Sequence, residues 1–210
     1  MRYLLVLFLL WGIFACIAVD KTNRTQREAE QFLREFRQLE LERSTKEQVA
    51  LLADKYHGHW SLHSISAPGV PGCGLGSASV DFVFENWWLH WFLFAPVTTF
   101  DAGVDMNDNR VCYSGITFGK REIGFNGVSV QGFLVNPLSG PPFEVNLRPS
   151  ATSVRYDVRA TPAERSVAYS INLGCLSRLR GCNDTRDISP QLWQGAHEDG
   201  LSYWKSPWNK

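Results

Sequence analysis

Three histidines, His57, His59 and His63, are the residues of this chain whose type and spacing come closest to a metal site. In an extended segment every second side chain points to the same face, so the three imidazoles could share one side of a strand. Imidazole nitrogen binds zinc, copper and nickel, and a catalytic zinc takes three protein ligands and a water molecule. Because His57 and His63 would lie about 20 Å apart on a straight strand, only His57 and His59 can hold one ion, with a third ligand such as His90 or a carboxylate. A metal-dependent enzyme is therefore one alternative, and a solvent-facing polar strand is the other.

A run of aromatic residues from Val80 to Phe94 favours binding chemistry. Seven of its fifteen positions are Phe or Trp, and such side chains line pockets for apolar molecules or present flat faces to sugars. The chain contains no Gly-x-Ser-x-Gly elbow, His-Glu-x-x-His helix or phosphate-binding loop, so we expect no catalytic residue and no cofactor. The residues that we expect to bind a ligand are Trp60, Trp87, Trp88, His90 and Trp91.

The N-terminus has the pattern of a secretory signal, with Arg2 ahead of an apolar stretch and small residues up to Ala18. We expect cleavage after Ala18, removal of residues 1–18 and secretion of the rest. Cys16 could instead be the lipidated cysteine of a bacterial lipoprotein, although the bulky Phe14 fits that pattern poorly. The 21 basic and 21 acidic residues of the chain cancel, so the positive charge typical of a nucleic-acid-binding protein is absent.

Four cysteines would remain in the secreted chain, an even number that favours disulfide bonds in an oxidising compartment. The pairings that we expect, among three that are possible, are Cys175 with Cys182 and Cys73 with Cys112. CxxC spacing is absent, so a zinc site is a poor alternative. Sequons at Asn23 and Asn183 predict N-glycosylation at the surface.

Charge separates the N-terminal segment, 19–56, from the remainder of the chain. From Asp20 to Tyr56 there are 16 charged residues among 37, with no Gly or Pro, which is typical of solvated helix. Apolar residues recur within it at three- and four-residue spacing, and Ser44 and Glu47 have the spacing of a capping box that opens a second helix. We expect a helical hairpin that packs on the main domain or contacts a membrane surface or a partner protein.

The segment 57–174 has short runs of β-branched and aromatic residues between Gly, Pro and Asn, with no helical period. We expect a mainly β domain, an antiparallel β-barrel or a β-sandwich, with strands that include Trp87 to Phe94 and Ser166 to Leu173. Asn126-Gly127 is the strongest hairpin-turn signal. The remaining segment, 175–210, is expected to form a disulfide loop and a C-terminal tail.

Gly58-His-Trp60, at the start of the first β run, resembles the entry motif of the lipocalin family. The resemblance implies an eight-stranded cup around a hydrophobic small molecule, with Trp60 closing the floor and Arg159 or Arg165 packed over it. The match is three residues long, and the charged helical segment before it departs from the family pattern.

These features together predict a secreted binding protein for a hydrophobic small molecule in an aromatic-lined β-barrel cavity. A carbohydrate-binding β-sandwich and a metal-dependent enzyme that uses His57 and His59 are the alternatives.

Overall fold

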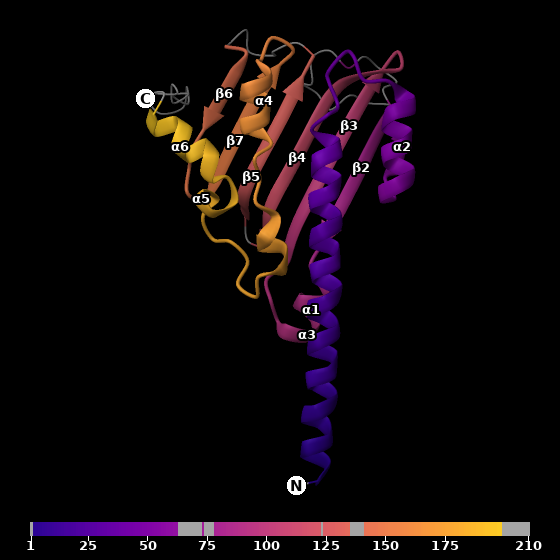
Figure 1. Ribbon diagram of the computed structural model, residues 1–210, viewed down its shortest axis with the longest axis vertical. Helices are drawn as coiled ribbons and strands as arrows, with labels where there is room; N and C mark the ends of the chain where they lie inside the picture. The colour runs from indigo at the N-terminus through magenta and orange to yellow at the C-terminus, as the bar shows by residue number, and fades with distance from the viewer. Residues whose placement is uncertain (1, 63–72, 74–77, 123, 135–140, 199–210) are drawn as a thin grey trace.

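In the computed structural model, which describes residues 2–62, 73, 78–122, 124–134 and 141–198, the chain forms one β-sheet and one layer of helices (Figure 1). The helices are α1 (Arg2–Phe36), α2 (Lys46–Tyr56), α3 (Trp87–Leu93), α4 (Pro162–Ala168), the 3-10 helix η1 (Leu173–Ser177), α5 (Thr185–Ile188) and α6 (Pro190–Glu198). The strands are β1 (His59–Leu62), β2 (Ala78–Glu85), β3 (Thr98–Asn107), β4 (Arg110–Glu122), β5 (Gly124–Phe133), β6 (Phe143–Asn146) and β7 (Ala151–Asp157).

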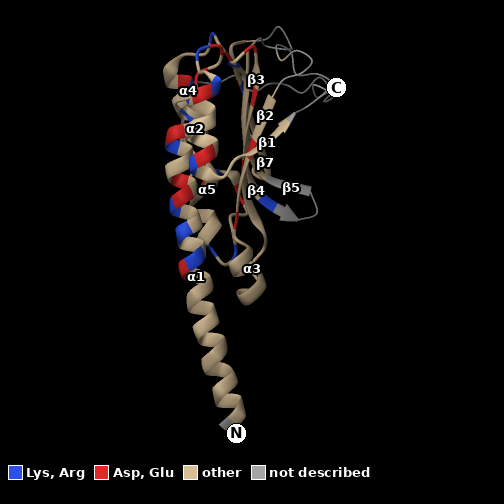
Figure 2. Cartoon of the chain, turned by 90° about the vertical axis from the view of Figure 1, so that its right-hand side faces the viewer, with Lys and Arg blue, Asp and Glu red and all other residues tan. Residues whose placement is uncertain are grey.

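The sheet is open and mixed, so the predicted antiparallel barrel or sandwich is wrong. Its seven strands lie in the order β1-β2-β3-β4-β5-β7-β6, and β5 pairs with β7 in parallel. The end strands β1 and β6 do not pair with each other, which a closed barrel would require. The fold is therefore α/β with two layers, and the predicted N-terminal helical segment is present as α1 and α2 on one face of the sheet (Figure 2).

Helix α1 joins the two layers through one apolar face. The buried residues of this face follow the helical period, with Thr22 and Ala29 two turns apart and Phe32, Leu33 and Phe36 on the next two turns, as expected for a helix that packs on a sheet. Phe32 is fully buried, with its ring centroid 4.6 Å from that of Phe82 and 5.2 Å from that of Tyr56. Alternation along β3 supplies the opposing surface, since every second residue from Phe100 is buried. Phe32 is thus the centre of the core.

Three local predictions within the segment 57–174 are corrected. Trp87 to Phe94 is not a strand, because it forms helix α3. Ser166 to Leu173 is not a strand either, since α4 continues to Ala168 and η1 begins at Leu173. Asn126-Gly127 lies inside β5, because β4 and β5 pair as far as Glu122 opposite Gly124.

Three hydroxyl groups hold α4 and the chain after it against the sheet. The hydroxyl oxygens of Tyr156 and Tyr169 lie 2.7 Å apart, and both are within hydrogen-bond distance of the Ser114 hydroxyl. The Tyr156 ring crosses strand β5 at Gly132, where a β-carbon would lie only 2.4 Å from the ring. Burial raises the pKa of Tyr169 well above its ordinary value, so its hydroxyl stays protonated and serves as a fixed structural group.

Both predicted disulfides are confirmed. Cys73 pairs with Cys112, and Cys175 pairs with Cys182. The first ties the segment before β2 to strand β4, and the second closes the loop between η1 and α5. Together with the apolar N-terminal helix they fit a protein that is exported to an oxidising compartment.

Candidate functional site

Helix α3 is a short projection from the connection between β2 and β3, and Asn86 holds it in place. Asn86 is 1 % exposed, and its side-chain oxygen accepts a hydrogen bond of 2.8 Å from the backbone N–H of Thr98. Its side-chain nitrogen donates a hydrogen bond of 3.0 Å to the carbonyl of Pro96. The helix ends at Phe94, which takes a left-handed conformation with φ of 54° and donates its N–H to the carbonyl of His90. One buried side chain therefore fixes both ends of the projection.

The large side chains of α3 face outward. Leu89 is the one buried residue of the helix, whereas Trp91 is 69 % exposed and Phe94 is 87 % exposed. Trp87 and Trp88 are each a little over two-fifths exposed. The aromatic cluster, which we define as Trp87, Trp88, Trp91 and Phe92, lines an apolar pocket of about 380 Å³. A patch of this kind on a protein surface marks a contact with another apolar body.

Helix α1 is one apolar neighbour of the aromatic cluster. The ring of Phe14 stacks on the ring of Phe92 with centroids 5.5 Å apart, and Phe92 in turn stacks on Trp88 at 5.8 Å. On the same face of α1, Ala18 is completely buried. Helices α1 and α3 lie side by side at this end of the molecule, and α1 continues past α3 into open space (Figure 1).

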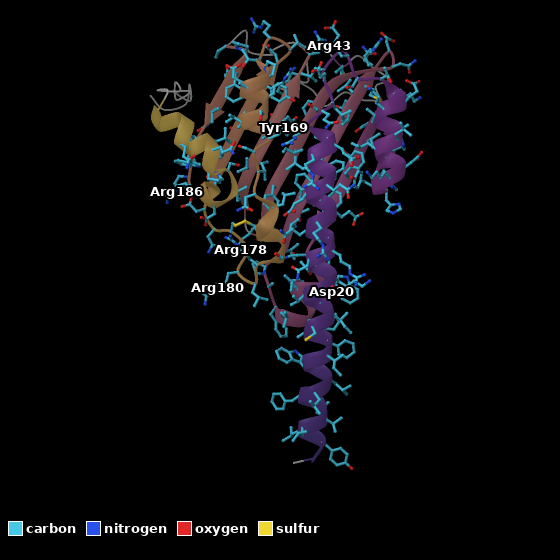
Figure 3. The ribbon with its side chains drawn as sticks, in the orientation of Figure 1. Asp20, Arg43, Tyr169, Arg178, Arg180 and Arg186 are labelled. Carbon is cyan, nitrogen blue, oxygen red and sulfur yellow. A yellow bond between two sulfur atoms is a disulfide. The ribbon has the colours of Figure 1, made fainter. Side chains whose placement is uncertain are left out.

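The projecting part of α1 is apolar all round. From Tyr3 to Val19 the helix has no charged residue, and Figure 2 shows that the charged residues, coloured blue and red, begin where α1 reaches the sheet. These 17 residues span about 26 Å at 1.5 Å per residue, which is close to the roughly 30 Å hydrocarbon core of a bilayer. By length and composition α1 could cross a membrane, although a signal sequence passes the same test. Asp20, the first charged residue after this part, lies beside α3 (Figure 3).

Four of the five predicted ligand-binding residues are brought together on α3, but not inside a barrel. His90 does not line the pocket; its Nδ1 lies 2.8 Å from the carbonyl oxygen of Ala95, where it holds the turn after the helix. Trp60 is on the edge strand β1, opposite Val80, and does not line the pocket of the aromatic cluster either. Sequence reasoning missed the part played by Phe92, whose position four residues after Trp88 is helical spacing.

Two of the three predicted metal-binding histidines, His57 and His59, lie in the described part of the chain. His57 ends α2 in a left-handed conformation, and His59 begins β1. His63 lies outside the described residues. Among the residues that are described, no group of three or more His, Cys, Asp or Glu side chains is placed to hold a metal ion.

Gly58 of the lipocalin-like triplet has a local reason to be glycine. A β-carbon there would lie 2.6 Å from the ring of Phe82, so glycine lets the end of α2 approach β2. Of the two arginines proposed to cover Trp60, Arg159 pairs with Asp157 and Arg165 lies 3.8 Å from a carboxylate oxygen of Glu40.

The two sequon asparagines are exposed. Asn23 is on α1 just after the projecting part, and Asn183 precedes α5. The side-chain oxygen of Asn183 accepts a hydrogen bond from the ammonium group of Lys120.

Comparison of the chain with protein-family models, with curated proteins and with solved structures finds no match.

Proposed function

We propose that this protein is an exported, membrane-anchored lipid-binding protein, in which α1 spans the bilayer and the aromatic cluster of α3 binds lipid at the bilayer surface. The observation that carries the proposal is that one end of the molecule bears both features. The uncharged half of α1 leaves the domain beside α3, and the tryptophans of α3 are exposed at the same level (Figures 1 and 3). In this proposal, the hydrophobic ligand expected from the sequence is a membrane lipid.

The types of the exposed residues support a position at the interface. Tryptophan is enriched at membrane–water interfaces because its ring is apolar and its N–H is polar. The indole N–H of Trp87 donates a hydrogen bond to the carboxylate of Glu85, so a polar group lies just inside the aromatic cluster. Leu89, on the opposite side of the helix, fixes the cluster to the domain. This arrangement lets α3 lie in the plane of the headgroups.

The proposal requires residues 1–18 to be retained, whereas the signal pattern predicts their removal. Support for retention comes from the packing of α1. The bond after Ala18 lies within one unbroken helix, Ala18 is completely buried, and Phe14 stacks on Phe92. Cleavage would remove Phe14 and leave the aromatic cluster without its neighbour. The disulfides after the span favour an orientation with the folded domain outside the cytoplasm.

N-glycosylation at Asn23 and Asn183 stays part of the proposal. Both side chains are exposed on the side of the span where the disulfides lie. An intact mass measured on protein extracted from membranes tests retention and glycosylation together. We expect a chain that still contains residues 2–18. A mature protein that begins at Val19 would contradict the anchor.

Aqueous quenching tests whether the tryptophans of α3 meet lipid. The full chain is placed in phosphatidylcholine nanodiscs, and acrylamide quenching is compared between the wild type and single Trp→Phe variants. Trp60 and Trp88 are a matched pair, because they are 41 % and 42 % exposed but only Trp88 is on α3. We expect Trp60→Phe to remove an accessible tryptophan and Trp88→Phe to remove a shielded one. Equal accessibility of the two would refute the proposed lipid contact.

A carbohydrate-binding function is the second candidate, because the exposed rings of Trp87, Trp88 and Trp91 are what a sugar-stacking surface needs. It predicts that these rings stay open to water beside a bilayer and that soluble oligosaccharides shift their fluorescence. The neighbours of the aromatic cluster favour lipid, since Phe14 and Phe92 offer no hydrogen bonds to sugar hydroxyl groups.

A further inference from the structure

A second exposed element lies at the end of the molecule that carries α3. It is the loop Arg178-Leu179-Arg180, between η1 and α5, and all three of its side chains are exposed. Leu179 is 55 % exposed although its neighbours Cys175 and Leu176 are buried. The Cys175–Cys182 disulfide closes this loop over seven residues, so the apolar tip and the two arginines are held together. An exposed Leu between two Arg has the composition of a segment that enters a membrane surface.

The packing of the loop sets its position. η1 packs on α1 and on β3. At Gly181, which has a φ of +60°, a β-carbon would lie 2.8 Å from the side chain of Lys120 and 3.2 Å from that of Thr98. Thr98 is the first residue of β3, directly after the turn that follows α3. The loop therefore lies at the end of the sheet from which α3 projects, and Figure 3 shows Arg178 and Arg180 near the level of Asp20 and α3.

The charge at this end favours an anion. Among the described residues, neither Arg178 nor Arg180 forms an ion pair, and the nearest polar contact of Arg178 is the Cys182 sulfur at 3.7 Å. Lys120 adds a positive charge beneath the loop.

Among the side chains that the structure describes, three acidic ones at this end of the molecule are already engaged. Asp20 pairs with Arg24 at 2.8 Å, Asp184 pairs with Arg186, and Glu85 accepts hydrogen bonds from Trp87 and Thr99. The two exposed guanidinium groups are thus the main uncompensated charges of the loop.

We infer that the Arg178-Leu179-Arg180 loop is a binding site for an anionic phospholipid, with Leu179 among the acyl chains and both guanidinium groups on the headgroup phosphate. The inference rests on the proposed function, because it needs α3 at the bilayer surface. Guanidinium binds phosphate through two parallel N–H donors, which a lysine cannot reproduce. The loop would then bind the anionic headgroups of one patch of bilayer, and the aromatic cluster would bind the acyl chains of the same patch.

Brominated lipids test the inference on the full chain. Nanodiscs contain phosphatidylcholine with about 30 % phosphatidylglycerol, and bromine is placed on the acyl chains of one lipid or of the other at equal mole fraction. The quenching of the α3 tryptophans is taken as the difference in quenched tryptophan fluorescence between the wild type and the triple variant Trp87→Phe, Trp88→Phe, Trp91→Phe. Two arginines near a membrane surface should favour the anionic phosphatidylglycerol over phosphatidylcholine by up to about 30-fold at the one lipid position that they contact. Dilution by the other lipids around α3 reduces this to roughly a twofold excess of quenching by brominated phosphatidylglycerol.

The variant Arg178→Gln, Arg180→Gln should abolish the excess while quenching by brominated phosphatidylcholine persists. The matched control is Arg186→Gln, an exposed arginine that is already paired with Asp184, and it should keep the excess. Equal quenching by both lipids in the wild type, or an excess that survives the double variant, would overturn the inference but leave the proposed function standing. If neither lipid quenches α3, the proposed function itself fails.

Discussion

Replacement of Asn86 by Ala tests whether this buried amide positions the aromatic cluster. The change leaves the N–H of Thr98 and the carbonyl of Pro96 without the partners that now lie at 2.8 and 3.0 Å. Each buried polar group that loses its partner costs about 1–3 kcal/mol. Pro96 is only partly buried, so the cost of leaving its carbonyl without a partner lies at the lower end of this range. We expect a loss of about 3 kcal/mol in the free energy of unfolding, which is a large part of the roughly 5–15 kcal/mol typical of a folded domain.

Thermal unfolding of the full chain in nonionic detergent measures this loss. At about 2–4 °C per kcal/mol for a chain of this size, the melting temperature should fall by roughly 6–12 °C. Leu51→Ala on α2 is the control, because Leu51 is 71 % exposed and its loss should change stability by no more than about 0.5 kcal/mol. An Asn86→Ala variant that melts within about 2 °C of the wild type would show that the amide does not hold α3 in place.

Three further outcomes follow from the same structure. Phe32→Ala should lower the free energy of unfolding by about 3–5 kcal/mol in a denaturant titration, because the ring is fully buried at the centre of the core; a loss below about 1 kcal/mol would contradict that position. Glu35 accepts hydrogen bonds from Lys55 and Tyr56, chiefly the first, which lowers the pKa of its carboxyl. Its small contribution is therefore present above the pKa of an unfolded glutamate and lost as the pH falls through the lowered value. The wild type should melt above Glu35→Gln at pH 7, and the difference should begin to shrink below about pH 4.3 and disappear once the pH is below the lowered pKa of Glu35. The double variant Cys175→Ser, Cys182→Ser should lose about 2 kcal/mol through the entropy of its seven-residue loop and should lower the preference for brominated phosphatidylglycerol, whereas an unchanged preference would show that the disulfide is not needed to shape the loop.

Much of the architecture could be predicted from local patterns. The stripe that contains Phe32 and Phe36 predicts the face of α1 that is buried. The even count of cysteines favours two disulfides, and the short spacing of Cys175 and Cys182 predicts one pair, which leaves Cys73 with Cys112. Apolar residues also alternate along β2 and β3, which is typical of strands with one buried face. These features depend on neighbours in the sequence or on one chemical bond, which is why the sequence reveals them.

Local patterns could not predict whether the sheet is open or closed. Period-two alternation predicts strands but not which strands pair, and the parallel pairing of β5 with β7 depends on the long connection between them. A run of short strands is therefore equally compatible with a barrel and with an open sheet.

The strand predicted over Trp87 to Phe94 is wrong for a different reason. Bulky aromatic residues favour strands, and two helical turns are too short for a 3.6-residue period to emerge. The buried side chains of Asn86 and Leu89 decide the outcome through tertiary contacts. Helix α4, by contrast, had a local signal, since Thr161 and Glu164 form a capping box with Pro162 at the first helical position.

The central claim is that α3 lies at the depth of the bilayer interface. The most direct measurement uses Trp91, the most exposed tryptophan of the aromatic cluster. Its fluorescence, taken as the difference between the wild type and Trp91→Phe, is recorded in nanodiscs whose phosphatidylcholine carries bromine at a shallow, a middle or a deep acyl position. The account predicts strong quenching by shallow bromine that declines with depth. Fluorescence that no brominated lipid quenches would place α3 in water and contradict the account.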